Sequence, residues 1–170
     1  GSWIRFEVNE YTVPPRTRAE IPFEITVPLN ATPGDHAAGV VAENTEIEAQ
    51  VQDDDINLGI ERRVGSRVYV RVAGPITPAL RIDNLQVEHR DPLVSGLSGQ
   101  HHVLVEYDVT NAGNIRITSE ARVEIESLFG VTLKEFDAHP VPELLPGNSV
   151  HIIEAWETVP PLGPITANVE

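Results

Sequence analysis

The residues of this chain best suited to chemistry lie along one alternating stretch, between Gly59 and Val72. Every second position there points to the same face of an expected strand, and the outward set is basic and aromatic in a strongly acidic protein. Guanidinium groups flanking a tyrosine can grip carboxylates or phosphates through charge-assisted, bidentate hydrogen bonds. We take four of these positions as candidate ligand-binding residues and call them the arginine stripe: Arg63, Arg67, Tyr69 and Arg71.

A simpler interpretation is that the arginine stripe only stabilises its own sheet. Its guanidinium groups then pair with acidic residues of neighbouring strands, at about 0.2–1 kcal/mol for each pair. The available partners are Glu20, Glu24 and Glu43. Because such pairs are common on sheet surfaces, this interpretation is favoured over ligand binding, although the stripe remains the best candidate site.

Metal binding is not predicted. Calcium loops place oxygen ligands at alternate positions around a glycine, whereas the acidic run Asp53-Asp54-Asp55 has neither feature and is typical of a solvated loop tip. Two histidines must be two residues apart to share one face of a strand. No such pair occurs among the six histidines, which are His36, His89, His101, His102, His139 and His151. We therefore expect no metal and no cofactor.

Catalytic chemistry is not indicated either. The chain has no cysteine and no Gly-x-Ser-x-Gly elbow that could present a nucleophile. The glycine-containing segment SGLSG at residues 95–99 precedes an expected strand, so no helix N-terminus follows it to bind a phosphate. We expect a protein that is not an enzyme.

Composition narrows the class of partner. The chain has 26 acidic residues against 12 basic ones, a formal net charge of -14, which repels nucleic acid backbones and anionic membrane surfaces. We therefore expect no nucleic acid partner. No stretch approaches the roughly 18 apolar residues needed to cross a bilayer. Without cysteine, disulfides and thiolate metal sites are excluded.

A repeated sequence pattern indicates two related modules. Residues 13–28 read VPPRTRAEIPFEITVP and residues 145–160 read LPGNSVHIIEAWETVP, each with a proline-initiated turn, an alternating strand and a final Val-Pro. Between them, Gly74-Pro75-Ile76-Thr77-Pro78 is typical of a stiff, extended connector. We place the first domain at residues 1–74, the connector at 75–78 and the second domain at 79–170.

The first module is expected to be incomplete. Its alternating segments predict strands over residues 3–8, 19–27, 36–43 and 59–72, with a long hairpin loop over 44–57. Pro22 marks the second of these as an edge or bulged strand. Four strands make only one sheet, and its apolar face needs a second sheet over it. We predict that N-terminal strands of this domain were removed or are supplied by another chain through strand addition.

The second module has the pattern of a complete sandwich. Turn signals every 8–12 residues separate seven expected strands, over residues 80–88, 103–110, 114–118, 121–128, 131–136, 150–156 and 165–169. Asn111-Ala112-Gly113-Asn114 supplies turn residues that can take positive φ. Trp156 is in phase with Val150 and Ile152 and is expected to fill the core. The predicted fold class is all-β, with two tandem immunoglobulin-like β-sandwich domains, the first incomplete at its N-terminus.

Several of these segments carry a family resemblance. The run VPLNATPGDHAAGVV at residues 27–41 resembles a signature of the WxL-interacting protein family of Gram-positive cell surfaces, with Ala38 where that family has a second glycine. The run RRVGSRVYV at residues 62–70 is similar to a late strand of its first domain. Residues 109–114, 128–130 and 145–147 are similar to its second domain. The arginine-rich, lysine-poor usage suggests an actinobacterial-type member.

The resemblance implies an exported protein of the cell wall. Its first domain would bind peptidoglycan, its second would contact a host or partner protein, and a C-terminal membrane anchor, absent from this chain, would hold it. Our leading hypothesis is a non-catalytic, extracellular, cell-surface binding or adhesion protein whose partners are a cell-wall polymer and a surface protein. The alternative is a structural spacer, in a surface protein or pilus-like assembly, with no ligand of its own.

Overall fold

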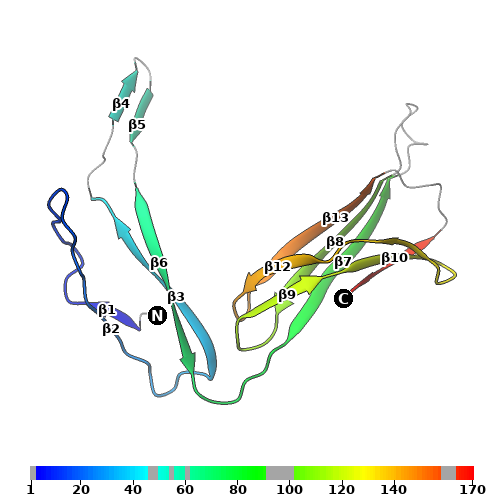
Figure 1. Ribbon diagram of the computed structural model, residues 1–170, viewed down its shortest axis with the longest axis horizontal. Coiled ribbons are helices and arrows are strands. Elements are labelled where there is room, and N and C mark those ends of the chain that lie inside the picture. The colour runs from blue at the N-terminus through cyan, green and yellow to red at the C-terminus, as the bar shows by residue number, and fades with distance from the viewer. Residues whose placement is uncertain (1–2, 46–49, 54–55, 60–61, 91–101, 158–163) are drawn as a thin grey trace. The chain divides into compact units, whose positions relative to one another are not determined.

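The structure is a computed structural model that describes residues 3–45, 50–53, 56–59, 62–90, 102–157 and 164–170. Strands make up 59% of the chain and no helix occurs among the described residues, which confirms the predicted all-β class (Figure 1). The several sheets are consistent with a β-sandwich. The chain separates into two compact units, Gly1–Thr32 and Pro33–Glu170. The predicted connector at 75–78 lies within the second unit, and the predicted division into two modules stays a prediction.

Unit 1 contains one short antiparallel pair. Strand β1 (Ile4–Phe6) pairs with β2 (Phe23–Ile25), and the rings of Phe6 and Phe23 lie 5.7 Å apart across the pair. Pro22 immediately precedes β2, because it has no N–H to donate to the ladder. The apolar face of this segment is not covered within the unit. Its side chains remain 37–44% exposed, because two strands form only one layer: Ile21, Phe23, Ile25 and Val27.

The second unit begins with a long two-stranded ribbon. Strand β3 (Gly34–Glu43) pairs antiparallel with β6 (Arg63–Val72) over all ten residues, close to the strands predicted there. The segment predicted as a loop over 44–57 instead contains a second hairpin, β4 (Gln50–Asp53) with β5 (Ile56–Gly59). Of the acidic run, Asp53 ends β4, and Asp54 and Asp55 lie outside the described residues.

The remaining strands form the sheets of a sandwich. One sheet has the order β13-β8-β7, from β7 (Leu80–Arg90), β8 (His102–Asn111) and β13 (Ser149–Glu157). A second has the order β11-β10-β14, from β10 (Val123–Ser127), β11 (Thr132–Glu135) and β14 (Ile165–Val169). Strand β9 (Ile117–Ala121) pairs with β12 (His139–Leu144). Six of the seven strands predicted in this region lie within two residues of their expected ends, and the one predicted over 114–118 begins later, at Ile117, and ends at Ala121.

Strand β12 was not predicted from the sequence. It contains Pro140 and Pro142, and proline normally argues against a strand because it cannot donate to a ladder. In the structure β12 pairs on one side only, with β9, among the described strands. An edge of that kind tolerates proline, since the missing N–H groups need no partner.

The hydrophobic core lies between the sheets of the sandwich. Strand β8 alternates strictly between buried and half-buried residues along all ten positions, as expected for a central strand with one face toward the core. Trp156 is partly buried and packs against this core, as predicted. The buried hydrophobic residues are Val103, Val105, Tyr107, Val109, Ala121, Val123, Ile125, Val141, Leu144, Ile152 and Ala167.

Two buried polar side chains of β8, Tyr107 and Asn111, differ in their hydrogen bonding. The amide of Asn111 donates to the carbonyl oxygens of Ile115 (2.7 Å) and Leu144 (2.9 Å) and accepts from the N–H of Gly113 (2.9 Å). The hydroxyl of Tyr107 is buried with no hydrogen-bond partner among the described residues, and burial raises the pKa of Tyr107 to about 12. The Asn111 amide therefore links the turn after β8 to the end of β12, whereas the Tyr107 ring contributes only apolar packing.

Substitutions at these two positions should have opposite consequences. We expect Asn111→Ala to lower the free energy of unfolding by about 2–4 kcal/mol, because two carbonyls and one N–H are left unpaired in the core. Tyr107→Phe should leave it unchanged or raise it by about 1 kcal/mol, since the hydroxyl pays for burial without a bond. Urea unfolding of both variants measures the difference, and a larger loss for Tyr107→Phe than for Asn111→Ala would contradict it.

Candidate functional site

The arginine stripe lies on one face of the β3–β6 ribbon. Cross-strand partners share a face, and the register places Arg63 opposite Glu43, Tyr69 opposite Ala37 and Arg71 opposite Asp35. The stripe residues are exposed, while the valines that alternate with them along the second half of β6 are half-buried: Val68, Val70 and Val72. The predicted alternation of this strand is therefore present.

The two ends of the stripe form ion pairs within the ribbon. Arg63 lies 3.0 Å from Glu43, one of the partners that the pairing interpretation names, and both side chains are largely exposed. Arg71 grips Asp35 through two hydrogen bonds, at 2.6 and 2.8 Å. This second partner was not considered from the sequence. The first pair contributes little to stability because water competes for it, whereas the second is bidentate and more strongly fixed.

The middle of the stripe belongs to a cluster that reaches the sandwich, which we call the tyrosine cluster: Arg67, Tyr69, Arg116 and Glu143. The Tyr69 hydroxyl donates to Glu143 of β12 at 3.2 Å. The guanidinium of Arg116 lies 4.6 Å from the centre of the Tyr69 ring and 3.4 Å from Glu143. The interaction of Arg67 with Tyr69 raises the pKa of Arg67.

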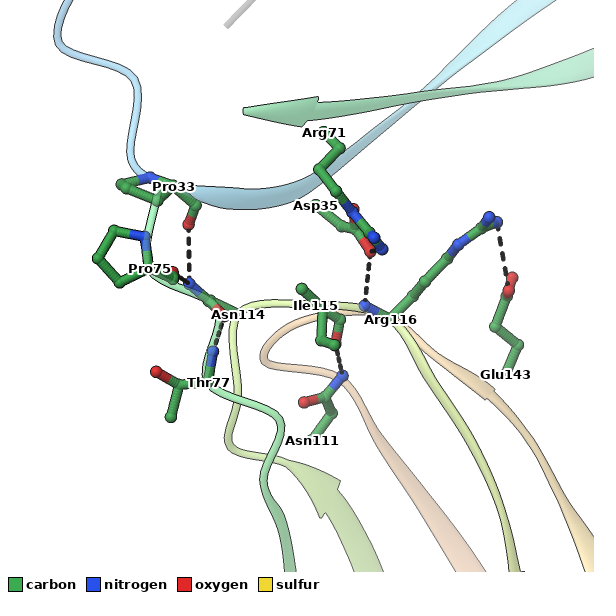
Figure 2. Close-up of polar contacts among 10 residues, drawn as sticks. All are labelled: Pro33, Asp35, Arg71, Pro75, Thr77, Asn111, Asn114, Ile115, Arg116 and Glu143. Atoms are coloured by element: carbon green, nitrogen blue, oxygen red, sulfur yellow. Dashed lines mark hydrogen bonds and ion pairs between the residues drawn. The ribbon is translucent and has the colours of Figure 1, made fainter. Parts of the chain in front are cut away.

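Asp35 carries the strongest electrostatic interaction of this region. Its side chain is only 6% exposed, and besides Arg71 it accepts a hydrogen bond from the backbone N–H of Arg116 at 2.9 Å. These two donors, the Arg71 guanidinium first, lower the pKa of Asp35 to about 2. The carboxylate of one ribbon residue therefore fixes both a guanidinium of its own ribbon and a backbone group of the sandwich (Figure 2).

Asn114 completes the connection between ribbon and sandwich, as Figure 2 shows. Its side-chain amide donates to the carbonyl oxygens of Pro33 (3.0 Å) and Pro75 (2.9 Å) and accepts from the N–H of Thr77 (2.7 Å). Its backbone oxygen accepts from the N–H of Asp35 at 2.7 Å. We call this set the joint: Gly34, Asp35, Arg71, Asn114 and the backbone of Arg116.

Gly34 is required by the geometry of the joint. Its φ is +122°, a conformation that residues with a side chain rarely adopt, and a Cβ there would lie 2.0 Å from the backbone oxygen of Asn114. The turn around Asn114 was predicted to exploit positive φ, but neither Asn111 nor Asn114 has a positive φ. Their side chains instead provide the cross-links that hold neighbouring turns together.

The described residues outside this region offer little that suggests chemistry. No group of three or more His, Cys, Asp or Glu among them could hold a metal ion. His151 pairs with Asp108 at 2.7 Å and His139 with Glu154 at 2.8 Å. His101 and the segment at 95–99 lie outside the described residues. Nor does any helix in the described part of the chain have the length and apolar character to cross a membrane.

Sequence reasoning found half of the tyrosine cluster and missed the other half. Arg67 and Tyr69 stand out because they alternate along one strand. Arg116 and Glu143 lie 47 and 74 residues further along than Tyr69, so no local spacing connects them to it. Comparison of the chain with models of known protein families, with curated proteins and with solved structures found no match. The family resemblance therefore rests on the motifs quoted above.

Removing the charge of Asp35 should destabilise the joint in a pH-dependent way. We expect Asp35→Asn to lower the free energy of unfolding by about 1–3 kcal/mol at pH 7, because charge-assisted hydrogen bonds to Arg71 are lost. The folded-state pKa of about 2 lies below the ordinary value of 3.8, so the stabilisation is complete above about pH 4 and disappears as pH falls through about 2. Urea unfolding between pH 7 and pH 2 measures this.

An exposed carboxylate provides the control for this prediction. Glu20 lies 3.1 Å from Arg18 with both side chains more than 80% exposed, so Glu20→Gln should change the stability by less than about 0.5 kcal/mol at any pH. An Asp35→Asn deficit that stays constant down to pH 2 would contradict the role given to the Asp35 carboxylate.

A methyl group at Gly34 should disrupt the joint, whereas one at Gly39 should not. Gly34→Ala brings Cβ against the backbone of Asn114, while a Cβ at Gly39, in the same strand, meets nothing within 4 Å. We expect exchange of the Asp35 amide hydrogen, which bonds to Asn114, to speed up at least about tenfold in Gly34→Ala and to stay unchanged in Gly39→Ala. Equal protection in both variants would show that the joint does not depend on Gly34.

Proposed function

We propose that this chain is a non-catalytic, extracellular binding protein associated with the cell wall. The proposal joins the family resemblance to one structural observation, the convergence of two guanidinium groups and a phenol hydroxyl in the tyrosine cluster. Arg67 and Arg116 both approach Tyr69, from β6 and from the segment before β9. Such a group of donors suits the carboxylates of peptidoglycan stem peptides or the phosphates of other wall polymers.

The tyrosine cluster already contains a carboxylate, that of Glu143, in the place that a ligand anion would take. Arg116 and Glu143 are 3.4 Å apart, with side chains 41% and 35% exposed. A pair of this kind is worth little in water, so an external carboxylate can replace Glu143 at small cost. The Glu143 carboxylate thus indicates that the site accepts anionic groups. We propose that the wall ligand binds to Arg67, Tyr69 and Arg116.

The wider setting is also part of the proposal. Two tandem immunoglobulin-like domains would present sheet faces and edges, and a second surface would contact a protein partner. The arginine stripe contributes unequally, since Arg63 and Arg71 are engaged by Glu43 and Asp35. Arg67 is therefore the stripe residue on which ligand binding depends most.

A structural spacer is the second candidate, and the joint favours it. A module that only holds another domain at a distance needs a fixed connection to its neighbour. Asn114 provides such a connection through hydrogen bonds to the backbone of Pro33, Pro75 and Thr77, and Asp35 through one to the backbone of Arg116. Two hydrogen bonds from Arg71 hold the Asp35 carboxylate in place. Under this hypothesis the tyrosine cluster belongs to the connection, and no ligand binds to it.

Retention on purified cell walls separates the two candidates. In dilute buffer we expect the intact chain to bind and Arg67→Glu to bind at least about tenfold more weakly, because the attraction between the Arg67 guanidinium and an anionic ligand becomes repulsion. Arg122→Glu is the matched control, since Arg122 makes a loose, exposed pair with Glu135 at 3.6 Å, away from the cluster. Salt should weaken binding of the intact chain.

Two results would remove the binding proposal. No retention of the intact chain at either salt concentration would leave the spacer hypothesis. Equal losses for Arg67→Glu and Arg122→Glu would show that general charge, rather than the tyrosine cluster, governs retention.

A further inference from the structure

A cavity lies at one side of the sandwich, where β12 and β13, strands of different sheets, contact each other. Its volume is about 460 Å³, and sites for small ligands generally occupy about 300–1,000 Å³. Its apolar wall is formed by Phe136, which follows β11, and by Ile152 and Ile153 of β13. We call it the β13 cavity. Its size and apolar wall suit a ligand of a few amino-acid residues.

Two opposite charges at the β13 cavity have no counter-ion. Glu154 is already engaged, because its carboxylate lies 2.8 Å from Nδ1 of His139 and its side chain is only 19% exposed. The ammonium of Lys134, the only lysine of the chain, lies 5.3 Å from the centre of the Phe136 ring. Neither Lys134 nor Asp137 forms an ion pair with any residue that the structure describes. One ammonium and one carboxylate at the cavity are therefore available to a ligand.

The outer edge of β13 supplies hydrogen-bonding groups beside the cavity. The N–H of Asn111 donates to the carbonyl oxygen of Asn148, just before β13. The N–H of the next residue, Ala112, donates to Ala79, just before β7. Backbone groups alternate in direction along a strand, so odd-numbered residues of β8 bond to even-numbered residues of β13. Ile153 therefore directs its N–H and C=O to the outer edge, where β13 pairs with no other described strand.

A peptide strand paired with this edge would place a side chain in the cavity. A residue that bonds to Ile153 has its own side chain on the same face as that of Ile153. Its neighbours in the peptide have theirs on the face of Ile152, which is 9% exposed and lines the cavity with Phe136. An apolar side chain next to the bonded residue would therefore enter between Phe136 and Ile152.

Charge favours a peptide with one charge of each sign. Residues 33–170 contain nine basic and 22 acidic residues, a net charge of -13, which repels a purely anionic ligand. A purely cationic ligand would meet the Lys134 ammonium. A zwitterionic ligand can place its carboxylate at Lys134 and its ammonium at Asp137, so it satisfies both groups at once.

We propose that the β13 cavity binds a short, extended peptide with an apolar side chain and charged ammonium and carboxylate ends. One peptide residue pairs with the N–H and C=O of Ile153, and the next packs its side chain on Phe136 and Ile152. The backbone pairing provides affinity, and the cavity and the two end charges provide specificity. The site shares no residue with the tyrosine cluster, so it is independent of wall binding through Arg67.

NMR titration of the ¹⁵N-labelled intact chain with the tetrapeptide Ala-Ala-Leu-Ala tests this site. We expect saturable shifts of the Ile153 amide resonance and at least about tenfold slower hydrogen exchange of that amide at saturation. An Ile153 amide that is already protected before peptide is added would show that the edge is occupied and would overturn the proposal. So would the absence of saturable shifts up to about 10 mM peptide.

The edge contact is tested by proline at position 153. Ile153→Pro removes the N–H that points outward, and an edge strand tolerates proline there, so peptide binding should weaken at least about tenfold while the fold is kept. Ile153→Val keeps the N–H and is the matched control, and it should bind as the intact chain does. Circular dichroism melting establishes that both variants are folded. Equal affinities of the two variants would contradict strand pairing.

Modified peptides test the charged ends, whether or not Ile153→Pro folds. Amidation of the carboxylate end and acetylation of the ammonium end should each weaken binding at least about threefold. Lys134→Gln should weaken binding of the unmodified peptide by a similar factor but leave the amidated peptide unaffected. Asp137→Asn should do the same with respect to the acetylated peptide. Losses that are independent of the matching end group would contradict the assignment of Lys134 and Asp137.

Discussion

Every sheet in this chain needs a second layer over its apolar face. The apolar face of β8 is fully covered, and its inward side chains are almost completely buried beneath the opposite sheet. On β7, Leu80, Ile82 and Val87 are covered only in part and remain 37–40% exposed. The apolar face of β1 and β2 is not covered within its own unit. At about 25 cal/mol per Å² of apolar surface, uncovered strands of this kind forgo much of what normally drives folding. Which apolar faces are covered by a second sheet therefore determines which parts of the chain are stable by themselves.

The ribbon of β3 and β6 is fixed to the sandwich by polar groups at its base. Asp35 and Asn114 each satisfy several backbone and side-chain groups at once, which gives the joint a defined geometry that an apolar contact of similar size would not impose. The same arrangement divides the arginine stripe. Its ends are committed to Glu43 and Asp35, and its middle extends into the tyrosine cluster.

Strand positions could largely be read from the sequence because alternation is a local property. The repeated sequence pattern shows the limit of such predictions. Its second copy forms the nine-residue β13 along the central β8, whereas its first copy forms only the three-residue β2 beside β1. The alternating pattern shows that a segment can form a strand, and the length of the strand it pairs with determines how long that strand becomes. Arg116, Glu143 and Asp35 were not found for the same reason, since their roles depend on long-range pairings that no local spacing encodes.

The arrangement of charges lets ligand binding and a fixed joint coexist. Arg116 uses its backbone N–H for Asp35 and its guanidinium for Tyr69 and Glu143, so the two functions employ different atoms of one residue. An anion that replaced Glu143 would leave the Asp35 bonds to Arg71 and to the Arg116 backbone in place. The low pKa of Asp35 keeps those bonds intact at mildly acidic pH. A fixed joint therefore does not decide between a binding protein and a spacer, and Arg67, which lies outside the joint, is the residue that distinguishes the two proposals.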